Sequence, residues 1–449
     1  MIAPLRPPVS LKSGFSKRAF WVFGFGLALA SQKVHADADT IKLGFDYGLS
    51  AVGISNNDGK TTTADDLNYY SHQIRAYLNG QLSPNVEAGL RVQSVNVWGL
   101  EGSTNAPSTR YPAADGTPWI EQAYLHMPRL AGNHLALTLG RQSIVVGDGL
   151  LVSDDDLGFN ALRAQIRLPW QLGLDLFTAK INEGLENKTD FDLNGVVASL
   201  KRGDNHWDLA WVQEINDAPS NYRLGGSTQT ASRVNRTFYD LRLFGDLKDA
   251  YYKLELALGQ GNASTSAGDV KIQGQSEKIE LGAQTDTARL GRFGVKALYA
   301  SGSGDDPDST DKDESFRPTF SKRWKGLQRE GWGRHFAATP SDAYDPDHPF
   351  SSDGTGLPGV ASGIKTLGLG LFTIQKVNWT GSIDYFTYDS RIKVSGQNSL
   401  GAELDLGLLY RYTNSVSFDF SAATFFPGDV YGPETSKVTR YTASTQIHF

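Results

Sequence analysis

From residue 37 onward, apolar and polar side chains alternate one by one in segments of roughly ten residues, the length of a membrane-crossing strand. In residues 171–181, Leu172, Leu174 and Leu176 fall on one face and Asp175 falls on the other. A period of two indicates a β-strand with one apolar face, because successive strand side chains point to opposite sides. No convincing amphipathic helix lies between these segments. The pattern therefore predicts an all-β protein.

About eighteen segments carry this alternation, and bacterial transmembrane barrels contain an even number of strands. The segments span residues 40–55, 67–82, 86–98, 118–127, 134–142, 160–168, 171–181, 190–201, 205–215, 235–245, 250–260, 273–285, 290–302, 363–375, 377–389, 399–412, 416–426 and 436–449.

The connections between the segments alternate in length. Every second one is a short turn, such as 83–85, 169–170 or 412–415, whereas the intervening ones are longer and polar. Outer-membrane barrels have short turns at their periplasmic end and long loops outside. We therefore predict a transmembrane antiparallel β-barrel over residues 37–449, with both ends periplasmic and a long outer loop at about 303–362.

The last segment ends on an aromatic residue. Tyr441, Ala443, Ile447 and Phe449 share the face predicted to contact lipid. Because hydrocarbon does not tolerate an open sheet edge, this strand is expected to pair with the first one. A terminal aromatic is also favoured by the barrel-assembly machinery, which is therefore an expected partner together with outer-membrane lipid.

Residues 1–36 have the layout of a secretory signal peptide. Lys12, Lys17 and Arg18 precede the apolar run 19–30, and small residues follow up to Ala36. We expect cleavage after Ala36, because the alternative of an N-terminal membrane anchor needs a longer apolar run. A signal peptide for export and a transmembrane β-barrel together predict that the protein lies in the outer membrane of a Gram-negative bacterium.

Charge and cysteine content narrow the possible partners. The chain has a net charge of −6, and residues 1–36 contain five basic and no acidic residues, so the exported part is more acidic still. A strongly acidic protein binds nucleic acid poorly. The absence of Cys excludes thiol catalysis and Cys-bearing metal sites.

If the apolar positions face lipid, the alternate positions line a charged lumen. Rows of Arg and carboxylate make a polar wall that wets a channel, although the same charges could pair with one another and only solvate the interior. Closure is expected to bring Arg75, Arg91, Arg163, Arg167 and Arg411 to a common constriction. The other positions predicted to line the pore from this parity are Arg242, Arg391, Arg440, Glu87, Asp240, Glu403 and Asp405.

The stretch 139–168 resembles the alginate export porin family. The resemblance rests on a strand that ends Gly140-Arg141-Gln142, an acidic loop, and a strand that opens Asn-Ala-Leu-Arg at Arg163. It implies an 18-stranded outer-membrane barrel with an arginine-rich, anion-selective pore for an acidic polysaccharide, and pore-lining roles for Arg141 and Arg163. Strict alternation from Leu139 points Arg141 toward lipid, so its role requires a bulge near Gly140.

Loop 303–362 is far longer than ordinary connections, which indicates a function or disorder. Asp305, Asp308 and Asp311 in its acidic half could hold Ca²⁺, although a solvated acidic run is favoured. The basic and aromatic half could fold over the pore and contact a sugar or an anionic solute, or pack only on its neighbours. That half contains Arg323, Trp324, Arg329, Trp332 and Arg334.

These features predict a channel rather than an enzyme, with no cofactor required and a monomer favoured. The expected cargo is a hydrophilic, anionic solute or an acidic polysaccharide, as in alginate export; the alternative is a general or substrate-specific diffusion porin. A barrel hydrolase or an adhesin is less favoured. Ser71 and His72 are a candidate hydrolase pair with His72 on the lipid-facing parity, but no second Ser, Asn or Asp constellation is identifiable beside them.

Overall fold

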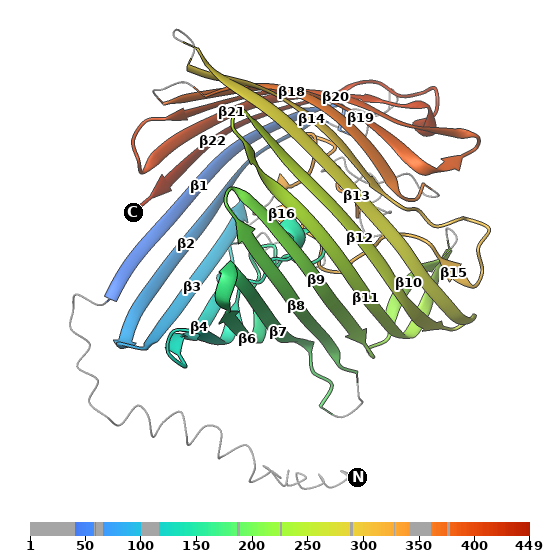
Figure 1. The fold of residues 1–449 in the computed structure, drawn as a ribbon. Helices are drawn as coiled ribbons and strands as arrows, with labels where there is room; N and C mark the ends of the chain where they lie inside the picture. Colours follow the sequence, from blue (N-terminus) through green and yellow to red (C-terminus); the bar gives the residue numbers. More distant parts are fainter. Residues whose placement is uncertain are drawn as a thin grey trace, which may run out of the picture.

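The computed structural model describes residues 41–57, 59, 66–99, 116–185, 189–224, 227–287, 291–326, 328–341, 361–374 and 378–449. These residues form a closed antiparallel barrel of 18 strands, which confirms the predicted fold (Figure 1). The predicted signal peptide lies outside the described residues.

The wall strands correspond one to one with the predicted segments. They are β1 (Ile41–Ser55), β2 (Leu67–Ser83), β3 (Val86–Val97), β4 (Trp119–Leu130), β5 (Leu135–Gln142), β6 (Phe159–Arg167), β7 (Leu172–Asn182), β8 (Phe191–Arg202), β9 (Asn205–Asn216), β11 (Ser227–Leu247), β12 (Ala250–Thr265), β13 (Gly268–Thr287), β14 (Gly291–Gly302), β18 (Ile364–Ile374), β19 (Trp379–Val394), β20 (Gln397–Arg411), β21 (Val416–Pro427) and β22 (Val438–His448).

Four short strands and three 3₁₀ turns complete the described structure. The short strands are β10 (Ser220–Leu224), β15 (Lys312–Asp313), β16 (Trp324–Lys325) and β17 (Gln328–Arg329); the turns are η2 (Gly147–Gly149), η3 (Pro169–Gln171) and η4 (Asp429–Tyr431). None of the helical segments in the described part of the chain is long and apolar enough to cross a bilayer.

The barrel closes between its first and last strands. β1 pairs with β22 in antiparallel register, and the C-terminus lies on the same side of the barrel as the start of β1 (Figure 1). Phe449 and Phe45 exchange two backbone hydrogen bonds of 2.9 and 3.3 Å. Inside the seam, His448 Nδ1 lies 2.7 Å from Asp46 Oδ1. The pairing predicted for the last strand is therefore confirmed.

The outer face carries the apolar band that a lipid-facing wall requires. Leu256, Leu281 and Leu369 are 48, 50 and 66% exposed, and their strand neighbours on the opposite parity point inward. The predicted assignment of apolar positions to the outside is correct for these strands.

The inner face is not polar throughout, which the alternation pattern did not predict. Two apolar clusters lie inside the barrel, and wall residues such as Phe177, Val212 and Phe238 contribute to the first of them. Their partners include Leu151 and Phe320, which belong to loops that fold into the lumen. Apolar wall positions occur under these loops because the loops cover them and exclude water.

Candidate permeation site in the barrel lumen

Two loops meet inside the barrel. We call residues 143–158, between β5 and β6, the shelf, and residues 303–326 with 328–341 the lid. Their backbones are joined by hydrogen bonds from Ser153 N to Phe320 O (2.6 Å) and from Lys322 N to Gly149 O (2.7 Å). The Phe320 ring also packs against Phe159 at a centroid distance of 5.4 Å. Lid and shelf therefore form one continuous obstruction across part of the lumen.

Two carboxylates of β20 hold the lid against the wall. Asp405 accepts a hydrogen bond from Arg334 N at 2.9 Å, and Glu403 accepts from His335 N at 2.6 Å and from Phe336 N at 2.9 Å. Glu403 is fully buried and Asp405 is 2% exposed. Both acids face inward as predicted, but they bind three consecutive amides of the lid instead of facing an open pore.

Aromatic packing reinforces this anchor. Phe336 stacks on Tyr388 and Phe425 at centroid distances of 4.4 and 5.1 Å. His335 is 1% exposed, and its Nδ1 has no hydrogen-bond partner among the described residues. Burial lowers the pKa of His335 to about 3, and the positive charge of Arg440 adds to the effect. The docked lid therefore holds His335 neutral.

A second anchor lies on the opposite part of the wall. Glu214 of β9 accepts hydrogen bonds from Thr319 N (2.9 Å) and Thr319 Oγ1 (2.6 Å). Arg236 of β11 donates to the same hydroxyl at 2.9 Å. Phe316 packs against Phe238 nearby, at 5.9 Å between ring centroids. The lid is therefore attached to β9 and β11 as well as to β20.

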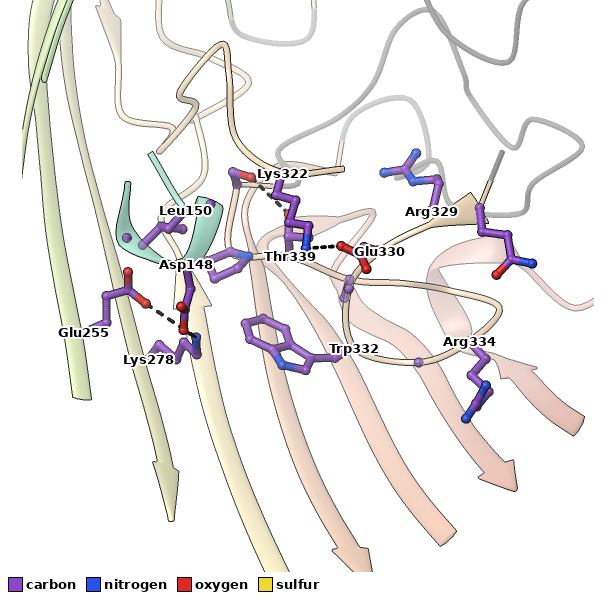
Figure 2. A pocket seen from close by; sticks show the side chains of 18 of the residues that line it. Asp148, Leu150, Glu255, Lys278, Lys322, Arg329, Glu330, Trp332, Arg334 and Thr339 are labelled. Carbon is purple, nitrogen blue, oxygen red and sulfur yellow. Dashed lines mark hydrogen bonds and ion pairs between the residues drawn. The ribbon is translucent and has the colours of Figure 1, made fainter. Parts of the chain in front are cut away.

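A cavity of about 420 Å³ lies between the lid, the shelf and the wall. Figure 2 shows the ring of Trp332 between Lys278 of β13 and Arg334 of the lid. The charged side chains that line the cavity are the basic Lys278, Lys322, Arg329, Arg334 and Arg440 and the acidic Asp148, Glu255 and Glu330.

The acidic residues of the cavity are all engaged in ion pairs. Asp148 Oδ2 lies 2.5 Å from Arg242 Nη2, Glu255 Oε2 lies 3.5 Å from Lys278 Nζ, and Glu330 pairs with Lys322. Five basic and three acidic side chains line the cavity; Lys278 and Lys322 are partners of these acids, and Arg334 Nη1 lies 3.6 Å from Asp419 Oδ1, so the excess of positive charge in the lining is modest. This excess arises where the lid contributes its own basic residues to the wall.

A second cavity of about 530 Å³ lies beyond the hairpin formed by β16 and β17. It shares Gln328, Arg329 and Glu330 with the first cavity, and Arg75 of the wall lines it as well. The hairpin therefore stands between two spaces in the lumen, and Arg329 is in contact with both.

The five arginines predicted to form a common constriction do not do so. Arg75 and Arg91 lie together because both pair with Glu121, at 3.1 Å in each case. Arg163 instead pairs with Asp175 of β7, where Nη2 lies 2.5 Å from Oδ2. Arg167 and Arg411 are exposed residues at the ends of their strands, beside short turns.

Glu121 is a lumen residue that the sequence did not reveal. The register between β3 and β4 shifts at Arg91 and Val92, so that Gln122 and Ile120 pair with these neighbours and Glu121 is the extra residue. Such a bulge breaks the simple alternation and turns a side chain inward.

Arg141 and Arg391 were predicted to line the pore, and both predictions are wrong. Arg141 pairs with Ala123 and Asn160 in an unbroken register, so the required bulge near Gly140 is absent and Arg141 stays on the outer parity. Its guanidinium donates to Leu157 O at 2.5 Å. Arg391 shares the parity of the exposed Ile383 and Tyr385, which places it on the outer face. For Arg141 the reason is that alternation continues along β5, and Arg391 stays on the outer face although the pairing of β19 with β20 is irregular between Tyr388 and Val394.

The remaining predicted wall residues are divided between the cavity and its surroundings. Arg440 lines the cavity, Arg242 pairs with the cavity residue Asp148, and Asp240 is 2% exposed behind them. Glu87 lies near the short-turn end of β3 and is exposed.

The lid residues singled out in the sequence have different surroundings. Arg329, Trp332 and Arg334 line the cavity. Trp324 is 3% exposed, with the Arg329 guanidinium 5.7 Å from its ring centroid. Arg323 N lies 3.3 Å from the carboxylate of Asp155 in the shelf. Three of the five therefore reach the space that a solute would occupy.

The acidic half of the lid does not gather into a metal site. Asp305 Oδ1 accepts from Glu314 N at 3.2 Å, and Asp308 N donates to Asp306 Oδ1 at 3.0 Å. No group of three His, Cys, Asp or Glu residues in the described ranges is placed to hold a metal ion, and Asp311 does not complete one.

Ser71 and His72 lie on opposite faces of β2. Ser71 is 7% exposed on the inner face, whereas His72 Nδ1 accepts a hydrogen bond of 2.7 Å from Trp98 Nε1 on the outer face. The two side chains therefore do not form a nucleophile and base.

Comparison with known proteins agrees with this architecture. Residues 40–332 match the family described as alginate export. Pseudomonas aeruginosa OccK8 (OprE) has a similar structure, with a TM-score of 0.55 and 9% identity over 92% of this chain and 98% of that one. Acinetobacter baumannii OccAB1 gives 0.56 and 8% over 93% and 99%. Pseudomonas aeruginosa OpdK with vanillate gives 0.52 and 10% over 91% and 98%.

These structural similarities concern the fold, because the sequence identities are low. No curated protein sequence matches the chain. The neighbours are outer-membrane porins with 18-stranded barrels, and this protein is likewise an outer-membrane channel of a Gram-negative bacterium. The family match covers more than half of the chain, including the shelf and most of the lid. The chain belongs to the alginate export family.

Proposed function

We propose that this channel passes small, carboxylate-bearing anions through the cavity between lid and shelf. The observation that carries the proposal is the charge of that cavity: its acids are held in ion pairs, while basic side chains outnumber them. Arg334 and Arg440 line the same space as Lys278 and Lys322, so an anion that enters meets basic groups from both the lid and the wall.

The size of this attraction is large enough to select between ions. At an effective dielectric of about 20, one guanidinium about 8 Å from a carboxylate contributes roughly 2 kcal/mol before salt screening. Two such groups would outweigh one acid that is already neutralised by a partner. Arginine suits this role because its guanidinium stays charged and can bind a carboxylate through two parallel hydrogen bonds.

The dimensions favour a small solute. A volume of about 420 Å³ lies within the range of small-molecule sites, which is roughly 300–1,000 Å³. A sugar acid of one or two rings fits that space, whereas a polysaccharide would require the lid to leave the lumen. OpdK, which has a similar fold, was crystallised with vanillate, a small aromatic carboxylate, and this supports a cargo of that size and charge.

Reversal potentials in asymmetric salt across a planar bilayer test the proposal. The wild-type channel should prefer anions, and the double variant Arg329→Gln/Arg334→Gln should shift the reversal potential toward cations. Arg202→Gln/Arg292→Gln is the matched control, because it removes two charges from exposed positions beside short turns and should leave the potential unchanged. A cation-preferring wild type, or equal potentials in all three proteins, would refute the proposal and favour a general diffusion porin.

A further inference from the structure

A groove of about 650 Å³ opens on the outside of the barrel, near the end that carries the long loops. Leu258, Gln260, Gln275 and Arg391 contribute to its lining. A smaller space of about 60 Å³ adjoins it and is lined by Leu256 and again by Arg391. The groove exists because β13 extends beyond the end of β14, whose pairing with it stops at Ser276 and Gly302 (Figure 1).

The register shows that these side chains point outward. Leu256 and Leu258 are both 48% exposed on the lipid-facing parity of β12, and Gln260 continues that row. Gln275 lies on the same parity of β13 as the exposed Ile279. These wall side chains therefore face away from the lumen and from the proposed solute path, and Ser303, Gly304 and Glu314 at the start of the lid complete the lining of the groove.

The position along the barrel axis places the groove at the level of lipid headgroups. β13 ends at Thr287 beside a short turn, and Glu277 lies ten residues before that end. At a rise of about 3.3 Å per residue and a strand tilt of roughly 40°, this stretch spans about 25 Å, the height of the apolar band of such barrels. Ile279 and Leu281 lie within the band, and Gln275 lies just above it.

The acids near the groove each have a partner, and Arg391 adds a positive charge beside Glu277, which keeps its own negative charge. Tyr299 Oη donates to Glu277 at 2.6 Å, and Glu314 pairs with Lys312. The guanidinium of Arg391, by contrast, makes no ion pair or hydrogen bond with any residue that the structure describes. Lys393 is exposed two residues further along the same face of β19.

We propose that this groove binds the headgroup of a phosphorylated glycolipid in the outer leaflet. Arg391 contacts a phosphate, for which guanidinium geometry is well suited. The amides of Gln260 and Gln275 bond sugar hydroxyls, and Leu256 and Leu258 contact the first methylenes of an acyl chain. A free sugar phosphate is the poorer fit, because it would leave this leucine pair uncovered just below the charged site.

Native mass spectrometry of the intact barrel in detergent tests this proposal, with lipid A, a bisphosphorylated and acylated glucosamine disaccharide, as the probe. Binding should weaken about tenfold or more in Arg391→Gln, as expected when a charge-assisted hydrogen bond is lost. Arg292→Gln, which removes an exposed arginine at the short-turn end, is the control and should bind like the wild type. Heat-modifiable migration verifies that each variant is folded.

Two further probes distinguish the source of the phosphate. Dephosphorylated lipid A should bind the wild type as weakly as lipid A binds the Arg391→Gln variant. Glucosamine phosphate without acyl chains should bind at least about tenfold more weakly than lipid A, because it leaves the leucine pair exposed. Equal affinity of wild type and Arg391→Gln for lipid A would overturn the proposal, as would binding of phosphatidylglycerol as tightly as lipid A.

Discussion

The lid should be released from the wall by mild acid because His335 is neutral in the docked state. Its ring is buried against Phe425, with 5.7 Å between ring centroids, and its backbone N–H is bound to Glu403. Burial and the charge of Arg440 hold the pKa of His335 at about 3 in this position. In a released lid the imidazole would return to an ordinary pKa of about 6.5.

The direction of the pH effect on lid docking follows from proton binding. A base with a lowered pKa binds fewer protons in the docked state, so docking is strongest above pH 6.5 and weakens as the pH falls. At pH 5 the released lid is almost fully protonated at His335, whereas the docked lid is not. This difference in proton binding weakens docking by about 2 kcal/mol, which corresponds to roughly a 30-fold shift of the docking equilibrium toward release.

Thiol labelling can follow this release, because the chain contains no Cys. Ala338→Cys lies at a fully buried position of the lid and should react with a membrane-impermeant thiol reagent only after release. Lys248→Cys, at a side chain that is 90% exposed, corrects for the effect of pH on the reagent. The corrected labelling rate should rise steeply between pH 7 and 5.

A second substitution isolates the contribution of His335. In the Ala338→Cys background, His335→Phe preserves the aromatic packing and removes the titrating group, so it should abolish most of the rise in labelling. His134→Gln, at an exposed position beside a short turn, should leave the rise intact. If His335→Phe kept the full pH dependence, the reasoning from the buried imidazole would be wrong, and other carboxyl groups would have to account for release.

Three further outcomes are expected. Glu403→Gln should increase lid-opening events in single-channel recordings about tenfold or more, because it removes the charge from two hydrogen bonds to the lid; unchanged dwell times would contradict the anchor. Deleting residues 305–355 should leave the barrel folded and raise its conductance, and an unchanged conductance would place the lid outside the path. Removing Phe449 should lower the yield in the outer membrane more than Phe426→Ala does, because Phe449 exchanges two backbone hydrogen bonds with Phe45; equal yields would refute this.

The barrel wall could be predicted because the membrane enforces one rule on every strand. Lipid requires apolar side chains on one face, so the period of two survives in all eighteen segments. The prediction was least accurate where β11 and β13 extend past the membrane. Residues 235–245 and 273–285 were expected there, but the strands span Ser227–Leu247 and Gly268–Thr287. Beyond the bilayer, both faces can be polar, and the alternation disappears.

The site could be predicted only in part. Alternation along a strand shows which face of the barrel wall a side chain lies on, but it shows neither the position along the barrel axis nor the residue's partner. The alternation of apolar and polar positions correctly predicted that Glu403 and Asp405 face inward. It did not indicate that the lid would cover them. Arg391 lies eight positions after Ile383 on β19, so alternation gives it the same face as this exposed apolar residue. Applied consistently, the same rule would have placed Arg391 outside.

Under the proposed function, solute selection depends on the lid more than on the wall, because the charges of the wall are largely paired. Arg163 is neutralised by Asp175, and Arg75 and Arg91 share Glu121, so the wall offers few free charges of its own. The lid adds Arg329 and Arg334 to the lining of the cavity, where Arg334 also lies 3.6 Å from Asp419 of the wall. Charges in such a confined space are screened less than charges on an open wall, and they act on a solute at shorter distance. In the proposed channel, the barrel determines where a solute passes, and the sequence of the lid determines much of the charge that it meets there.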